Sequence, residues 1–310
     1  MGIGKSKVAG LRWWIYLGME FIFYPVLFLA QFGQKYCRKF ESFRQRKPVE
    51  TPTIYIEVHE WGGYPMVRYK KITKSIPEFE CGLKYQLERF NNYTGYHFID
   101  LTVTMSDFEK HSDLAFVKSQ CADFIPVSNA GMDFSGYEAF YEKIKMRPNS
   151  YVLLSNSSIS SSQCDFLDSY IDYMEANPDV GILGISCCSK CYQTLIRNNF
   201  MPHLQSFFLL TTIEVLDQIV EQNGGSFPGS GIENKRLLIR EGEIRFSQKA
   251  LKLGYKLAVV ADGVPVKFDN CYKNWSFPFG DYRCHTQTPN TIHPIHNKFQ
   301  LASKNDVLFS

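Results

Sequence analysis

Short apolar segments typical of β-strands alternate with amphipathic segments from Thr53 to Val260, and this alternation restricts the fold more than any other feature of the sequence. The expected strands are Thr53–His59, Tyr96–Thr104, Ala122–Val127, Tyr151–Leu154, Val180–Ile185, Ser206–Thr211 and Tyr255–Val260. The expected helices are Glu78–Phe90, Asp107–Ser119, Phe134–Lys145, Ser162–Glu175, Thr212–Gln222 and Glu241–Leu253. This order predicts an α/β fold, Rossmann-like, with a mostly parallel sheet flanked by helices.

The stretch Pro126–Ile159 is the strongest candidate for a binding site. It reads as a Gly/Asn-rich turn, a helix and a buried strand. Asn129, Gly131 and Asp133 lie in the turn, where backbone N–H groups at a helix start suit phosphate or sugar oxygens. The strand ends in Ser155-Asn156-Ser157, and ligands bind at this carboxyl edge in open α/β sheets. Turn and packing roles explain the glycines of this stretch equally well.

The N-terminal stretch Trp13–Ala30 is apolar apart from Glu20 and contains Pro25. A helix needs about 20 such residues to cross the hydrocarbon core, so this stretch is borderline. Basic residues flank it on both sides: Lys5, Lys7, Arg12, Lys35, Arg38, Lys39, Arg44, Arg46 and Lys47. This pattern predicts a membrane-associating segment and basic linker over residues 1–50, with residues 1–47 at the membrane surface. The alternatives are a single signal-anchor span and a core helix of the globular domain.

The distribution of charge argues against a nucleic-acid partner. Residues 1–50 hold nine Lys/Arg and three Asp/Glu, whereas the whole chain of 310 residues has a net charge of only +3. The remainder of the chain is therefore net acidic. The nine cysteines are scattered and odd in number, which favours a reducing compartment over a disulfide framework. Cys188 and Cys191 form a lone C-x-x-C, which a zinc site would have to supplement with two more ligands.

Four segments in a fixed order resemble a known family. They are Asn129–Tyr137 (NAGMDFSGY), Tyr151–Ser157 (YVLLSNS), Pro202–Phe208 (PHLQSFF) and Glu241–Ser247 (EGEIRFS), the last followed by Leu253-Gly254-Tyr255. In this order and spacing the chain resembles glycosyltransferases of the rhamnan synthesis F type and related GT-A enzymes. The resemblance covers residues 122–260. It implies a GT-A fold that holds a nucleotide-sugar donor at the carboxyl edge of the sheet and receives an acceptor from the other side.

The resemblance also implies where the catalytic base lies. In GT-A enzymes an acidic pair precedes a helix that ends in Gly-Tyr, which makes Glu243 the first candidate for the base and Glu241 the second. The base would deprotonate the acceptor hydroxyl while the nucleoside diphosphate leaves. A carboxylate at a helix N-terminus is also favoured electrostatically, so simple helix capping is the alternative for Glu243. His203 is expected near the acceptor or leaving group, with a structural histidine as the alternative.

Charge neutralisation is where this sequence departs from the family pattern. Many GT-A enzymes hold Mg²⁺ or Mn²⁺ with an Asp-x-Asp after the central strand, and this chain has Ser155-Asn156-Ser157 at that position. Neutral side chains do not supply the anionic oxygens that these cations prefer, so no cofactor is assigned and a divalent cation, Mg²⁺ or Mn²⁺, stays open as the alternative. Basic side chains or helix N-termini would then offset the diphosphate charge. The candidates are Arg240, Arg245, Lys249 and the turn Asn129–Gly136.

The remaining donor-site candidates follow from the same segments. Asp133 is expected to contact ribose or donor-sugar hydroxyls, with helix N-capping as the alternative. Asn129, Gly131, Ser155, Asn156, Ser157, Gln205 and Arg245 complete the predicted donor-binding set. In the C-terminal region, Trp275 and its neighbouring phenylalanines suit sugar stacking or packing, and His293 and His296 suit metal or phosphate.

Together these features predict three regions: residues 1–50 as the N-terminal segment, 51–264 as the GT-A-like domain, and 265–310 as an irregular extension packed on it. The expected function is transfer of a hexosyl or deoxyhexosyl group from a nucleotide sugar to a glycan or lipid-linked acceptor, at the cytosolic face of a membrane. Two alternatives stay open. One is a non-catalytic glycan- or nucleotide-binding relative that has lost the acidic motif, and the other is a lipid-binding peripheral membrane protein.

Overall fold

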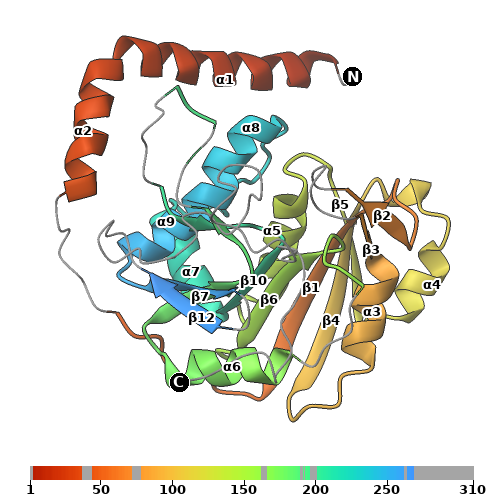
Figure 1. Cartoon of the computed structure of the whole chain (residues 1–310). Coiled ribbons are helices and arrows are strands. Elements are labelled where there is room, and N and C mark those ends of the chain that lie inside the picture. The colour runs from red at the N-terminus through yellow and green to blue at the C-terminus, as the bar shows by residue number, and fades with distance from the viewer. Residues whose placement is uncertain are drawn as a thin grey trace.

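The computed structural model describes residues 3–36, 44–71, 78–161, 166–188, 191, 193–195, 201–261 and 264–268. One large sheet organises them (Figure 1). Its strands, from edge to edge, are β12 (Val264–Phe268), β11 (Lys256–Ala261), β7 (Val180–Gly184), β10 (Phe208–Thr212), β6 (Tyr151–Asn156), β1 (Thr53–Trp61), β4 (Phe98–Ser106) and β5 (Asp123–Val127).

The sheet is mostly parallel. β1 pairs in parallel with both β4 and β6, β4 pairs with β5, and β7 pairs with β11. β10 is antiparallel to both of its neighbours, β6 and β7, and β12 is antiparallel to β11. The predicted α/β class with a mostly parallel, helix-flanked sheet is confirmed.

The core has one layer on each face of the sheet because successive side chains of a strand point to opposite faces. Leu153 of β6 packs in the cluster that includes residues of α3, α4 and α6, whereas Val152 and Leu154 pack with α5, α7 and α9. The helices are α3 (Leu83–Asn91), α4 (Leu114–Ser119), α5 (Asp133–Ile144), α6 (Leu167–Ala176), α7 (Ile213–Gln222) and α9 (Arg245–Lys252).

Two of the expected helices are shorter than the sequence suggested. The start of the segment expected as Glu78–Phe90 contains a strand, β3 (Phe79–Cys81), paired with β2 (Arg68–Lys70). Gly82, at φ 141°, separates β3 from α3. The segment expected as Asp107–Ser119 opens with a left-handed Asp107 and a single 3₁₀ turn before α4. The expected N-cap Ser162 of the next helix lies outside the described residues, and α6 itself begins at Leu167.

The expected helix Glu241–Leu253 is the end of a longer helical run. α8 (Lys235–Leu238) continues without interruption through a π-helical segment, η2 (Ile239–Ile244), into α9. Asn234 caps this run by accepting hydrogen bonds from two backbone N–H groups. Glu243 therefore lies in the middle of the run, and the helix-capping interpretation of this residue is wrong.

The C-terminal region is less irregular than the sequence suggested, because residues 264–268 form β12 at the sheet edge. Trp275, His293, His296 and the rest of the expected extension lie outside the described residues. A second small sheet pairs β8 (Cys187–Cys188) with β9 (His203–Leu204). In the described part of the chain no group of three or more His, Cys, Asp or Glu side chains is placed to hold a metal ion.

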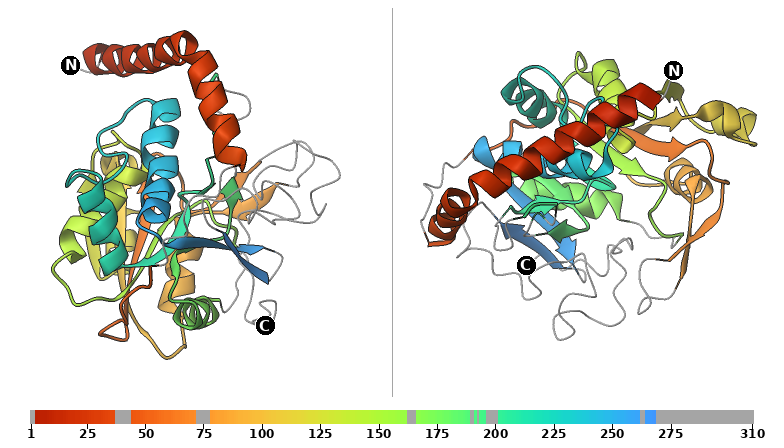
Figure 2. Two further views of the ribbon diagram at one scale, coloured as in Figure 1. Left: turned by 90° about the vertical axis from the view of Figure 1, so that its left-hand side faces the viewer. Right: turned by 90° about the horizontal axis from the view of Figure 1, so that it is seen from above.

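The N-terminal stretch forms two helices, α1 (Ile3–Ile22) and α2 (Tyr24–Tyr36). α1 lies across the molecule above α8, and α2 runs at a steep angle to α1 from its C-terminal end (Figures 1 and 2). No single described helix has the length and apolar composition to cross a membrane. The pair Gly10–Ile22 and Tyr24–Ala30, bent by 78°, meets those criteria only when the two are taken together.

α1 rests on the domain along one side only. Trp13 is buried, and the Glu20 carboxylate pairs with Arg240 at 2.6 Å and accepts a hydrogen bond from the Leu195 N–H. The outer side is apolar and exposed, through Leu11, Trp14, Ile15, Met19, Phe21 and Ile22. The core-helix alternative does not describe such a helix, because most of its large apolar side chains face outwards.

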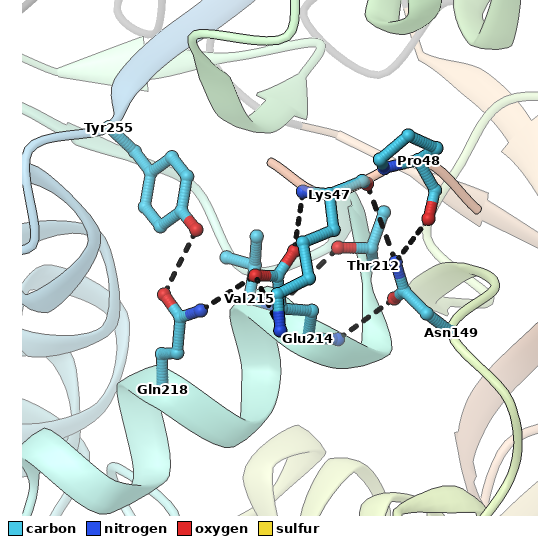
Figure 3. A network of polar contacts seen from close by, with 8 residues as sticks. All are labelled: Lys47, Pro48, Asn149, Thr212, Glu214, Val215, Gln218 and Tyr255. Atoms are coloured by element: carbon cyan, nitrogen blue, oxygen red, sulfur yellow. Dashed lines mark hydrogen bonds and ion pairs between the residues drawn. The ribbon is translucent and has the colours of Figure 1, made fainter. Parts of the chain in front are cut away.

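The end of the basic linker is fastened to the domain. Arg46 is buried, and its Nε donates to the Val180 carbonyl at 2.7 Å. Figure 3 shows the neighbouring contacts, in which the Lys47 N–H donates to Glu214 and the Asn149 amide donates to the Pro48 carbonyl. Arg46 is therefore a structural residue, which corrects its assignment to the membrane-facing basic cluster.

Candidate functional site

A cavity of about 690 Å³ opens at the carboxyl edge of the parallel strands. The ends of β1, β4 and β6, the start of α5, strand β2 and the run from α8 to η2 surround it. Six of the residues singled out by the sequence line it: Asn129, Asp133, Asn156, Ser157, Gln205 and Glu243. Segments far apart in the chain thus meet in one pocket.

β1 contributes side chains that the sequence reading missed. His59, Glu60 and Trp61 all line the cavity. The Thr53–His59 segment was interpreted only as an alternating strand, although it carries ionisable groups at Glu57, His59 and, just beyond it, Glu60. Charged groups inside a buried strand are costly unless they are paired or functional. The ionisable residues in and just after this strand were therefore the signal that could have identified β1 as part of a site.

Three cationic side chains converge on the pocket: Arg68, Lys70 and Lys235. Arg68 is fixed by an ion pair with Glu60 at 3.1 Å, by a hydrogen bond to the Ser157 hydroxyl at 2.7 Å, and by stacking over Tyr64. Burial lowers the pKa of Lys70 to about 8, and the nearby charges of Arg68 and Lys235 push in the same direction. An anion that binds beside Lys70 would stabilise its charged form.

The cations expected from the sequence have other partners. Arg240 pairs with Glu20 of α1, Arg245 pairs with Glu241, and the Lys249 ammonium donates to the Gln222 carbonyl at 2.6 Å. None of these side chains lines the pocket. Their assignment as the groups that offset the ligand charge is not supported by their positions.

The turn before α5 is as sharp as the sequence indicated. Gly131 has φ 101° and Met132 has φ 50°. A positive φ is unusual for any residue other than glycine. The N–H groups of Met132, Phe134 and Ser135 donate to carbonyls within the turn. These donors are thus already used, and the turn offers an anion fewer N–H groups than expected. Gly131 shapes the turn without lining the cavity.

The side chains of Asp133 and Asn156 are hydrogen-bonded to each other at the carboxyl end of β6. The Asn156 amide donates to Asp133 Oδ2 at 2.8 Å. The N-cap of α5 is Met132, with Asp133 inside the first turn, so the capping interpretation of Asp133 is wrong. Ser155 is buried, and its hydroxyl donates to the Glu57 carbonyl. One carboxylate beside neutral amide and hydroxyl groups is a poor ligand set for Mg²⁺ or Mn²⁺, so these residues do not fit the metal that the resemblance implies.

Glu243 is presented to the pocket by the π-helical segment, a geometry that often marks functional positions. Its Oε2 accepts hydrogen bonds from the Ser206 N–H at 3.0 Å and from the Ser206 hydroxyl at 3.2 Å. Its Oε1 lies 3.7 Å from Nε2 of the buried His203, whose Nδ1 is bound to the Met201 carbonyl. His203 thus supports Glu243 from behind and is not itself part of the cavity wall.

Glu241 lies on the same helical run but outside the cavity. Its buried carboxylate pairs with Arg245 one turn later. Of the two acidic candidates, only Glu243 lines the pocket.

The Gly-rich loop Gly224–Gly231 has the composition of a mobile lid, but it does not reach the cavity. Phe227 is buried against Tyr141 and Phe246, and no residue of this loop lines the cavity.

No protein-family model and no curated protein matches this chain.

Proposed function

We propose that this protein is a glycosyltransferase that moves a sugar from a nucleotide-sugar donor to a glycan or lipid-linked acceptor. The observation that carries the proposal is the meeting of Asn129, Asp133, Asn156, Ser157, Gln205 and Glu243 in one pocket at the carboxyl edge of the sheet. These are residues of the four segments that resemble GT-A enzymes. Their convergence is what a shared donor and acceptor site requires.

The proposed reaction assigns one proton step to Glu243. The acceptor hydroxyl attacks the anomeric carbon, the bond from that carbon to the diphosphate oxygen breaks, and the hydroxyl proton passes to Glu243. Ser206 donates two hydrogen bonds to Oε2, which hold the carboxylate in place beside the cavity. Gln205, whose side-chain oxygen accepts from Ser186, is held rigidly beside it.

The diphosphate charge is offset by Arg68, Lys70 and Lys235 in this proposal. Arg68 is already oriented by Glu60 and Ser157, so little side-chain entropy is lost when it contacts a phosphate oxygen. The two lysines add charge on the same pocket. Charge is thus balanced without the anionic metal ligands that the β6 end lacks.

Binding of a nucleoside diphosphate is expected to weaken as the pH rises through about 8, because Lys70 then loses its charge. An anion raises the pKa of this lysine on binding, so the complex takes up a proton near that pH. Lys70→Gln should lower affinity about tenfold and remove the pH dependence. Calorimetry with uridine, guanosine and thymidine diphosphates, in buffers of different ionisation enthalpy, measures both effects.

Lys71→Gln is the matched control, since Lys71 is exposed and does not line the cavity. Absence of binding for every nucleoside diphosphate would contradict the proposed function. Binding without turnover of any nucleotide sugar would instead favour a non-catalytic nucleotide-binding protein. An unchanged pH dependence in Lys70→Gln would remove Lys70 from the phosphate site.

The proposal includes association with a membrane surface through α1 and α2. The exposed side of these helices carries Trp14, Phe21, Ile22 and Leu29, each more than half exposed. The sequence surrounds this apolar surface with lysine and arginine, and such a pattern suits the interface of an anionic bilayer. If the stretch spans the membrane instead, the heavier basic charge after it favours a cytosolic domain.

The combined substitution Trp14→Gln and Ile22→Gln is expected to reduce binding to vesicles containing phosphatidylglycerol by at least about tenfold. Burying one large apolar side chain is worth about 1.5–3 kcal/mol, and 1.4 kcal/mol corresponds to a factor of about ten. Co-sedimentation of the full chain with vesicles measures the change. Phe98→Gln replaces an equally exposed aromatic at the start of β4, at the opposite end of the strands from the cavity, and should have no effect. Equal sedimentation of wild type and the double variant would refute the assignment.

A further inference from the structure

A chain of hydrogen bonds runs beneath the pocket between β1 and β4. Nδ1 of His59 lies 2.8 Å from Oγ1 of Thr104, and this hydroxyl also contacts Oε1 of Glu57. The register supports the contact, because His59 and Thr104 are direct neighbours on the two parallel strands. Glu57 and Thr104 are fully buried, while His59, only 4% exposed, lines the cavity. The chain therefore connects a buried carboxyl group to the ligand space.

The packing keeps this chain in place. Gly136 of α5 lies directly against it, and a Cβ atom there would come within 2.2 Å of Thr104 Oγ1, 2.5 Å of His59 Nδ1 and 2.7 Å of Glu57 Oε1. Only a glycine at this helix position leaves room for the three polar groups. Oε2 of Glu57 has no hydrogen-bond partner in the described part of the protein, an arrangement that is expensive in a purely structural role.

With Glu57 and His59 both neutral, one arrangement gives every proton of the chain an acceptor, because a proton on Oε2 of Glu57 would have no partner among the described residues. Burial raises the pKa of Glu57 well above its ordinary value, and burial lowers the pKa of His59. Asp133 of α5 pushes the pKa of both groups upwards, and Tyr137 of the same helix is itself kept protonated by burial. Glu60, the remaining acid on β1, is paired with Arg68. The raised pKa of Glu57 favours its protonated form, and the lowered pKa of His59 favours its neutral imidazole.

In that arrangement Glu57 Oε1–H donates to Thr104, the Thr104 hydroxyl donates to Nδ1 of His59, and the remaining histidine proton lies on Nε2. Because Nδ1 is occupied, Nε2 is the ring nitrogen that can meet a ligand in the cavity. A hydroxyl that accepts and donates at once can pass a proton in either direction.

We propose that Glu57, Thr104 and His59 form a proton relay that ends at Nε2 of His59 in the pocket. His59 gives its Nε2 proton to an oxyanion of the bound ligand, Thr104 passes its hydroxyl proton to Nδ1, and Glu57 returns a proton to the Thr104 oxygen. One proton moves in total, Glu57 becomes a carboxylate, and His59 stays neutral as the other tautomer. The identity of the oxyanion rests on the proposed function, where it is an oxygen of the departing nucleoside diphosphate.

His59 is the catalytic residue of this relay, and Glu57 and Thr104 are positioning residues that act through it. The relay lies in the same pocket as Glu243 but does a different task. Glu243 accepts a proton from the acceptor, whereas His59 supplies one to the leaving group. Two titratable groups with opposed roles then handle the two ends of one transfer.

The test compares Thr104→Val with Thr104→Ser in the full chain. Nitrogen-15 NMR of the histidine rings, with His59 assigned from a His59→Gln spectrum, reports which nitrogen is protonated. We expect the Nε2–H tautomer in wild type and in Thr104→Ser, and a loss of this preference in Thr104→Val. Thr211→Val is the control, since it removes a buried strand hydroxyl that bonds the Gly181 carbonyl on β7. The same tautomer in Thr104→Val as in wild type would overturn the relay.

Enzyme kinetics provide a second test of the proton relay. Glu57→Gln keeps a donor toward Thr104 and so keeps the Nε2–H tautomer, but it has no acidic proton to release. Its turnover should fall about 10²-fold with unchanged affinity for the nucleoside diphosphate, and Thr104→Ser should stay near wild type. Wild-type turnover in Glu57→Gln would reject the relay. The NMR arm needs no ligand, so failure of nucleotide binding would reject the proposed function while the tautomer result still decides the hydrogen-bond chain.

Discussion

Replacing Glu243 by glutamine is expected to lower turnover by about 10²- to 10⁴-fold while leaving donor affinity nearly unchanged. Glutamine has nearly the same shape and keeps an oxygen for the Ser206 hydrogen bonds, but it cannot take the acceptor proton. The expected split, with turnover lost and binding retained, distinguishes a base from a group that only holds the ligand. Single-turnover kinetics and calorimetry on the same preparation measure the two quantities.

Glu241→Gln is the rival variant for this experiment. Glu241 is two residues away on the same helical run, but its carboxylate faces Arg245 instead of the cavity. Its replacement should reduce stability more than turnover, because it leaves Arg245 without its ion-pair partner. If Glu241→Gln abolished turnover and Glu243→Gln did not, the assignment of the base would have to be reversed. His203→Gln should give an intermediate loss, since His203 only approaches Glu243 from behind.

The sheet could be predicted because its strands have a simple local signature. The strand expected at Tyr151–Leu154 is a run of β-branched and apolar residues, and the structure extends it only to Asn156. The helix boundaries were harder because they depend on single backbone conformations. Gly82 at φ 141° and Asp107 at φ 51° cut two expected helices short, and nothing in the apolar pattern signals such a change.

The positions of Asn129, Asp133, Asn156 and Ser157 in one pocket could be predicted because these residues stand at the end of a strand and in one sharp turn. The cationic side chains of the pocket could not be predicted in this way. Arg68 and Lys70 belong to the three-residue strand β2, which is too short to show a pattern, and Lys235 reaches the pocket only because the helical run starts before Glu241. Spacing along the chain does not show which charged side chains the tertiary fold brings together.

The N-terminal stretch illustrates how one residue changes an interpretation. Glu20 was the exception in an otherwise apolar run, and in the structure its carboxylate is the point at which α1 meets Arg240. Arg240 lies in η2, the segment that also presents Glu243 to the pocket. This ion pair therefore links the proposed membrane-facing helix to the segment that carries the proposed base.

Gly136→Ala is expected to destabilise the protein by about 2 kcal/mol, although alanine is the better helix former by about 1 kcal/mol. The added Cβ would stand 2.2–2.7 Å from three buried polar atoms. Overpacking of this kind costs about 1–3 kcal/mol, and displaced buried hydrogen bonds add about 1–3 kcal/mol more, so the steric cost wins. Denaturant unfolding gives the free energy, and the NMR spectrum of His59 should change with it. Gly18→Ala makes the same replacement in α1, where a Cβ meets nothing within 4 Å, and should be neutral or slightly stabilising. A Gly136→Ala variant as stable as wild type would mean that α5 can move away from the hydrogen-bond chain, and that close packing is not what holds Glu57, Thr104 and His59 together.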